Sequence, residues 1–178
     1  MKKTIFTFLL IASCAWALSL RSSVRVTIRS AAWNAGAFSV ARDVGDIDCF
    51  QQFDNGTATD QCSIAYQVQS TVSSASQRTF DLAGSLTDTL GNAVVFAKVK
   101  SIYIRNLSTD TLVIGNATNA WSSWISASGT ITLPAYGQVL LIAPQNGWSV
   151  TAGSADILGI SNIGISTASF NISVLGTN

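Results

Sequence analysis

The sequence contains no histidine and no glutamate, so nine aspartates are its only acidic side chains. Histidine is the usual general base and the commonest metal ligand. The chain also lacks a G-x-S-x-G elbow and a glycine-rich phosphate loop. A carboxylate hydrolase would need an acidic pair such as Asp46 and Asp48, but aspartates in polar segments are far more often turn formers. We therefore expect no enzyme, no catalytic residue, no metal site and no cofactor.

Charge is also scarce. Charged residues make up 11% of the chain and the net charge is +1, against a usual charged fraction of about 25%. After Asp110 the only ionised side chain is Asp156. Nucleic-acid binding needs clustered lysine and arginine to neutralise phosphates, so we expect no nucleic-acid partner.

Short stretches of alternating apolar and polar residues run through the chain, and none has the period of a helix. Examples are Val24–Arg29, Ser63–Thr71 and Ala168–Leu175. About ten such segments, separated by polar turns, predict an all-β fold: one antiparallel β-sandwich or jelly-roll-like domain over residues 18–178.

The stretch Val94–Gly115 lies at the middle of this pattern. Ile102–Arg105 and Thr111–Ile114 are predicted to pair as a hairpin across Asn106–Asp110, whose asparagine, serine and aspartate favour a turn. The alternation changes phase before Ile102, which predicts a bend or bulge near Lys100 and Ser101.

Residues 1–17 have the layout of a signal peptide. Lys2 and Lys3 are followed by the apolar run Ile5–Ala12, and Ala15–Ala17 fits a cleavage site. Alternatively, residues 11–14 resemble a bacterial lipobox, in which case an acylated Cys14 would be the only membrane anchor. A third alternative is an apolar first strand or assembly arm. An exported protein would be periplasmic, on the cell surface or extracellular.

Asp43–Gln61 is the most polar segment and is predicted to be a loop with a tight turn at Asp54–Gly56. Cys49 and Cys62 flank this turn, and in an exported chain we expect them to form a disulfide worth on the order of 3 kcal/mol. Two separate thiols are the alternative. The segment holds five aspartates, which could bind Ca²⁺ but match no known calcium loop, so solvated turn residues are the favoured interpretation. These residues are Asp43, Asp46, Asp48, Asp54 and Asp60.

Four aromatic side chains of the second half are candidates for a sugar-binding platform, although such residues more often cover the end of a sandwich core. They are Trp121, Trp124, Tyr136 and Trp148.

The charge-poor residues 111–178 hold more apolar side chains than one sandwich face can bury. Obligate oligomer interfaces are depleted in charge in the same way. We therefore expect a homo-oligomer, with Ile163 and Ile165 as candidate interface residues.

Five segments resemble small structural proteins encoded by tailed bacteriophages and prophages. The likeness runs from about Asp54 to Gly176, over the segments Thr79–Gly91, Phe96–Asn106, Gly129–Pro144, Asp156–Asn162 and Ser169–Gly176. This resemblance implies a non-enzymatic virion component, decorating a capsid or associated with a tail, that contacts its own copies and other virion proteins. It carries no catalytic residue. The alternative is a secreted or lipid-anchored surface β-sandwich that binds glycans or other surface ligands and contacts surface proteins.

Overall fold

A computed structural model describes residues 20–35, 40–126 and 128–178. Within them every regular element is a strand, so no helix there is long and apolar enough to cross a membrane. The signal-peptide prediction, including Cys14, lies outside the described residues. The strands are β1 (Ser22–Ala35), β2 (Val40–Asn55), β3 (Gln61–Cys62), β4 (Ile64–Val72), β5 (Gln77–Asp81), β6 (Leu86–Thr87), β7 (Ala93–Val94), β8 (Lys98–Asn106), β9 (Leu112–Gly115), β10 (Thr130–Leu133), β11 (Gln138–Ile142), β12 (Trp148–Ser149), β13 (Ile157–Asn162) and β14 (Ala168–Thr177).

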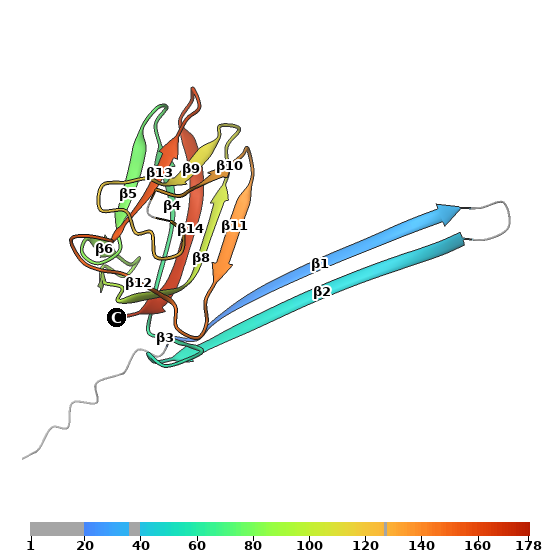
Figure 1. Cartoon of the computed structure of the whole chain (residues 1–178), viewed down its shortest axis with the longest axis horizontal. Coiled ribbons are helices and arrows are strands. Elements are labelled where there is room, and N and C mark those ends of the chain that lie inside the picture. The colour runs from blue at the N-terminus through green and yellow to red at the C-terminus, as the bar shows by residue number, and fades with distance from the viewer. Residues whose placement is uncertain (1–19, 36–39, 127) are drawn as a thin grey trace, which may run out of the picture.

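Two antiparallel sheets pack face to face, which confirms the all-β prediction and is consistent with a β-sandwich (Figure 1). One sheet has the order β11-β8-β14-β4, with β12 added beside β8, and the other has the order β10-β9-β13-β5. The short pair β6-β7 lies outside these sheets, and β1, β2 and β3 form a third group. The sandwich therefore begins at β4, and the described strands before it, β1 to β3, form a separate small sheet.

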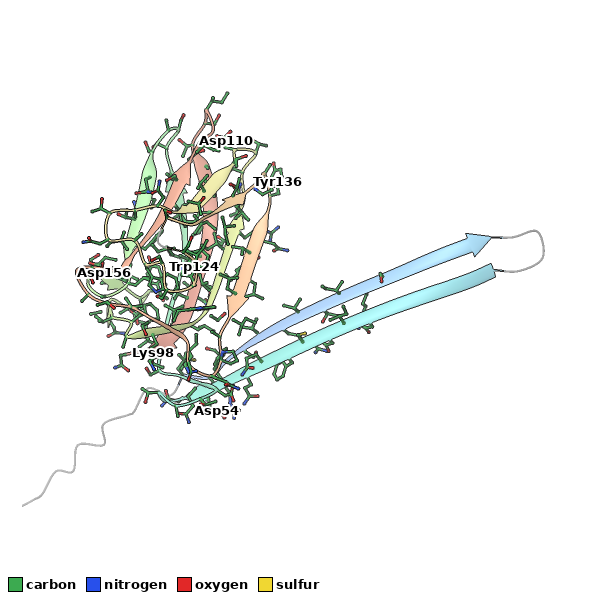
Figure 2. The ribbon with its side chains drawn as sticks, viewed as in Figure 1. Asp54, Lys98, Asp110, Trp124, Tyr136 and Asp156 are labelled. Carbon is green, nitrogen blue, oxygen red and sulfur yellow. The ribbon has the colours of Figure 1, made fainter. Side chains whose placement is uncertain are left out.

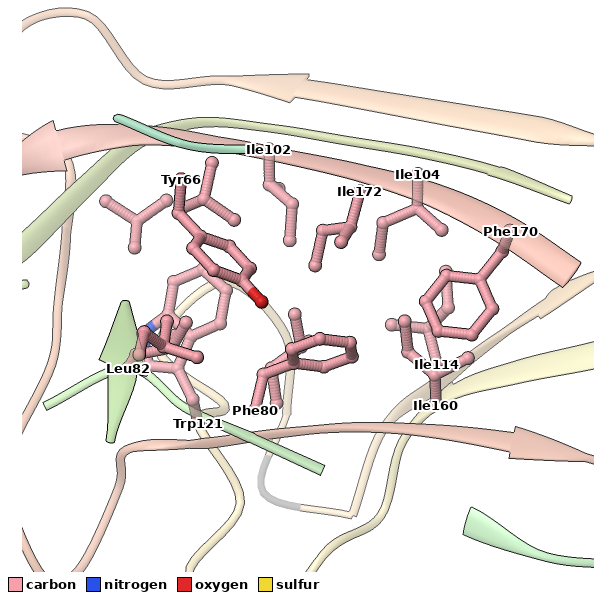
Figure 3. Close-up of a cluster of buried hydrophobic side chains, with 14 of the residues drawn as sticks. Tyr66, Phe80, Leu82, Ile102, Ile104, Ile114, Trp121, Ile160, Phe170 and Ile172 are labelled. Atoms are coloured by element: carbon pink, nitrogen blue, oxygen red, sulfur yellow. The ribbon is translucent and has the colours of Figure 1, made fainter. Parts of the chain in front are cut away.

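Alternating side chains of the two sheets fill the space between them (Figure 3). Along β14, Phe170, Ile172 and Val174 are buried, whereas the residues between them are only partly covered. Phe80 of the facing sheet lies edge-on to Phe170, with ring centroids 6.1 Å apart, and edge-on to Tyr66 at 6.2 Å. This interior follows directly from the period-two pattern of the sequence.

The predicted hairpin between Ile102–Arg105 and Thr111–Ile114 is wrong. These segments fall in β8 and β9, which belong to opposite sheets. Asn106 is fully buried in the connection; its Nδ2 donates to the carbonyl oxygens of Asp110 (2.7 Å) and Pro134 (2.9 Å). The polar residues turn the chain, as expected, but their side-chain hydrogen bonds stabilise a connection that passes from one sheet to the other.

The predicted bulge is confirmed at Lys100. Leu175 of β14 lies opposite Ser101, and the next residue, Gly176, lies opposite Val99. Lys100 is therefore the extra residue of β8, and the bulge lets both Val99 and Ile102 face the core.

A long two-stranded ribbon, β1 and β2, projects from the base of the sandwich and diverges from β11 (Figure 1). We call this ribbon the arm. The prediction of a loop over Asp43–Gln61 is wrong for most of that segment, because β2 runs to Asn55. The aspartates are compatible with a strand here because arginines of β1 pair with them across the ribbon. These pairs are Arg21–Asp54, Arg25–Asp48 and Arg29–Asp46.

Candidate functional site: the arm and its cleft

One face of the arm is apolar. The ladder places Val26 opposite Cys49 and Ile28 opposite Ile47, and directly paired residues of an antiparallel ribbon share a face. Ile28 is 56% exposed and Ile47 is 58% exposed. The arm therefore presents branched aliphatic side chains to solvent well beyond the point where it leaves the sandwich.

The opposite face carries the charges, together with Phe50, which lies opposite Arg25 and is 59% exposed. Arg25 Nε donates to Asp48 Oδ1 over 3.0 Å, and Thr27 Oγ1 donates to the same oxygen over 3.1 Å. The hydrogen bond from Arg25 holds the pKa of the Asp48 carboxyl below its usual value, and the same bond raises the pKa of the guanidinium. Exposed ion pairs contribute little to stability, but these pairs neutralise each other on one face of the ribbon.

A small cluster joins the arm to the sandwich. Phe53 and Cys62 are fully buried against Leu175, on the outer side of β14. Nearby, the Asp60 amide donates to the Pro144 carbonyl over 3.1 Å. These contacts lie between residues more than 80 positions apart, so they determine where the arm leaves the body. Leu20, Val24, Ala65 and Ile142 cover the cluster.

Lys100 reinforces this joint from inside. The bulged residue is 1% exposed, and its Nζ donates to the carbonyls of Ala58 (3.3 Å), Pro144 (3.0 Å) and Gln145. Burial lowers the pKa of this ammonium and nearby Lys98 lowers it further. The three acceptors come from two loops, β2–β3 and β11–β12, so the ammonium ties the base of the arm to the sandwich.

A cleft of about 820 Å³ separates β1 from the outer face of the β11-β8-β14-β4 sheet. Its floor is uncharged and combines polar side chains with Leu140 and Leu175. Tyr103 donates to Gln138 over 2.8 Å, and Gln67 donates to Ser173 over 3.1 Å. Figure 1 shows that the arm and the sheet separate with distance from the joint. The lining residues on the arm are Arg21–Thr27, and those on the sheet are Gln67, Ser101, Tyr103, Gln138, Leu140, Ser173 and Leu175.

The predicted disulfide is absent. Cys49 is an exposed free thiol on the arm, and Cys62 is a buried free thiol in β3. Cys62 lies beside Asn55, six strand residues beyond Cys49. That stretch spans roughly 20 Å, whereas disulfide-bonded Cα atoms are less than about 7 Å apart. The prediction failed because it assumed a folded loop where the chain is extended.

The structure brings three of the four candidate aromatics together. Trp121 lies 5.9 Å from Trp124 and 6.5 Å from Trp148 between ring centroids. Trp121 is 1% exposed, and its Nε1 donates to the Ser149 carbonyl over 2.9 Å. Tyr136 is exposed in the β10–β11 turn and lies near Asp110, away from Trp124 (Figure 2). Trp121 and its neighbours therefore cover the core.

Ile163 and Ile165 lie in the β13–β14 loop, 63% and 91% exposed. The loop is held by Asp110, whose Oδ2 accepts from the Ser166 amide over 2.8 Å. Figure 2 places Asp110 at the end of the sandwich opposite Asp54 and the joint. Their role at an interface stays a prediction, and their exposure supports it.

The aspartates of the polar segment are spread along the arm. Asp46, Asp48 and Asp54 pair with arginines, and Asp60 accepts from Gln51 Nε2 over 3.0 Å. Across residues 20–35, 40–126 and 128–178, no three histidine, cysteine or acidic side chains are grouped as metal ligands would be. Within these ranges the aspartates act as structural partners of the ribbon.

Sequence analysis predicted a strand over Val24–Arg29, within β1, but took most of β2 for a loop and missed the cleft. A partial signal for the second strand was present: Ile47, Cys49 and Phe53 fall on one phase of a period-two pattern, which Phe50 and Gln51 interrupt. No signal marked the cleft, because its walls come from segments far apart in the chain.

No family model matches this chain, and no curated protein matches its sequence.

Proposed function

We propose that the protein is a non-enzymatic structural subunit that assembles with copies of itself, as a virion component that decorates a capsid or associates with a tail. The observation that carries the proposal is the arm, a projecting hairpin with one apolar face left open to solvent. Such a ribbon is suited to contact between subunits.

Energetics support this role. An isolated two-stranded ribbon is marginally stable in water, and only the base of the arm is packed on its own sandwich. Full burial of an isoleucine is worth about 1.5–3 kcal/mol. Ile28 and Ile47 each keep more than half of their surface exposed, so a neighbouring subunit that covers them would gain roughly 1 kcal/mol or more per side chain.

The virion assignment is supported by the resemblance of segments such as Thr79–Gly91 and Gly129–Pro144 to structural proteins of tailed phages. The alternative of a glycan-binding surface protein depended on an aromatic platform. Trp121 is buried with its N–H occupied, so this aromatic group offers less surface to a sugar than a platform needs.

Analytical ultracentrifugation of the full chain tests the proposal. The comparison variant lacks residues 26–49, with Arg25 joined to Phe50 through an Asn-Gly turn, which suits a tight hairpin. This variant keeps Phe53 and the joint. We expect the full chain to be an oligomer at micromolar concentration and the short-arm variant to be a folded monomer. A full chain that stays monomeric at high concentration would refute self-assembly.

A further inference from the structure

The following inference rests on the proposed function and names the surface that receives the arm. We propose that two copies interlock as a symmetric clasp, in which the arm of each copy lies in the cleft of the other. The occupant of the cleft is thus the arm of a second copy.

The clasp gives a consistent order of layers. In one copy the cleft lies between its sheet and its own arm. When the partner's arm is inserted, four layers are stacked. Their order is the sheet of the first copy, the partner's arm, the first copy's own arm and the partner's sheet. The order is the same when counted from the partner, as a two-fold axis requires.

The faces match in this order. Phe53 and Val24 of the arm pack toward the sandwich at the joint, so the apolar face of the arm looks into the cleft. The two apolar faces then meet at the centre, where Ile28 and Ile47 lose their exposure to water. The ion-paired face of each arm, which also carries Phe50, lies on the partner's sheet, where Tyr103 and Ser173 offer polar contacts and Leu140 an apolar one.

The shape of the cleft suits a hairpin. The arm is packed on the sheet at the joint and separates from it with distance (Figure 1). Stacked β-layers lie about 10 Å apart. A ribbon inserted between arm and sheet therefore needs a gap of about 20 Å, and a diverging wedge passes through this width at some depth.

The buried area is sufficient. The 14 residues of β1 extend ~46 Å at about 3.3 Å per residue, and a two-stranded ribbon is roughly 10 Å wide. If only half of the length overlaps, each of the three layer contacts covers roughly 230 Å². Counted on both partners, the three contacts bury about 1,400 Å², within the range of stable interfaces of about 1,200–2,000 Å².

A bulky substitution on the floor of the cleft tests the clasp. Ser173→Trp fills the floor of the cleft, and Thr132→Trp, an exposed position on β10 of the other sheet, is the matched control. We expect Ser173→Trp to raise the dissociation constant about 100-fold or more and Thr132→Trp to leave it unchanged, both measured by analytical ultracentrifugation.

Thiol accessibility gives a second measurement that does not depend on a bulky side chain. In a Cys49→Ser background, Gln67→Cys places a thiol on the floor of the cleft. We expect a maleimide to label it slowly in the oligomer and rapidly when the arm is shortened as above. Protection that persists when the chain with its full arm is diluted to a monomer would show that the chain's own arm covers the cleft, and would overturn the clasp.

The outcomes separate the two proposals. If the short-arm variant is monomeric but Ser173→Trp remains an oligomer, and the thiol introduced by Gln67→Cys is freely labelled in the oligomer, then the clasp is wrong and self-assembly through the arm stands. If the unmodified chain is monomeric, both proposals fail.

Discussion

Replacing Lys100 with methionine tests whether the buried ammonium holds the arm to the sandwich. Methionine keeps most of the hydrocarbon stem and removes the charge. The Gln145 carbonyl then loses its donor, whereas the carbonyls of Ala58 and Pro144 keep the backbone amides of Gln61 and Asp60. An unsatisfied buried carbonyl costs about 2 kcal/mol and each half-satisfied one about 0.5 kcal/mol, giving roughly 3 kcal/mol in total.

Part of that loss is recovered. The pKa of Lys100 is lowered by burial, so the ammonium itself is disfavoured in its site, and removing it returns about 1 kcal/mol. The expected net loss in the free energy of unfolding is therefore about 2 kcal/mol, or about 4–8 °C in Tm for a chain of this size.

The assay is urea unfolding followed by circular dichroism, with Lys98→Met as the matched control. Lys98 is an exposed lysine two residues earlier on β8, and its substitution is expected to change stability by less than about 0.5 kcal/mol. Amide exchange at Asp60, which donates to Pro144, should accelerate only in the Lys100 variant. Equal stability of the two variants, with unchanged exchange at Asp60, would refute this account of the joint.

Three further predictions concern the joint and the far loop. Phe53→Ala should lower the free energy of unfolding by about 3 kcal/mol, because the side chain is fully buried. The control Phe50→Ala removes an exposed side chain of the same strand and should lower it by less than about 0.5 kcal/mol. Similar urea midpoints for the two variants would contradict this prediction. Burial raises the pKa of the Cys62 thiol above 9.0, so its contribution is complete below about pH 9 and is lost as the pH rises through the folded value; wild type should lose more stability than Cys62→Ala in alkaline melts, and parallel pH profiles would disprove it. Ile165→Asp should weaken self-association in ultracentrifugation without lowering Tm, whereas an unchanged oligomer would remove the β13–β14 loop from the interface.

The sandwich was predictable because its strands carry the period-two pattern within themselves. In β14, Phe170, Ile172 and Val174 are buried as the alternation requires. The bulge at Lys100 was also predictable, because it shifts this alternation by one residue. The pattern does not show which other strand each strand pairs with. The turn-forming residues that begin at Asn106 predict that the chain reverses its direction. A hairpin within one sheet and a crossing between two sheets are both consistent with that reversal.

Most of the second strand of the arm was missed for a related reason. Aspartate is a turn former in isolation, so Asp46 and Asp48 favoured a loop. Opposite them in β1 lie arginines whose side chains neutralise them, and that pairing is a property of two segments together. The cleft depends on contacts still further apart, such as Phe53 with Leu175. The candidate site therefore could not be predicted from any single segment of the sequence.

The position of β14 has a consequence for the order in which the molecule folds. This strand lies between β8 and β4, yet every other strand precedes it in the chain. Pairings such as Ile64 with Gly176 close loops of over a hundred residues, and such non-local topologies fold slowly. The arm, whose strands are neighbours in sequence, needs no such closure. Its two strands can therefore meet during synthesis before the sandwich is complete, but a two-stranded ribbon alone is marginally stable, and its joint packs on Leu175 of β14. The same last strand also supplies Ser173 and Leu175 to the floor of the cleft. The anchored arm and the cleft are thus completed together, when β14 is in place.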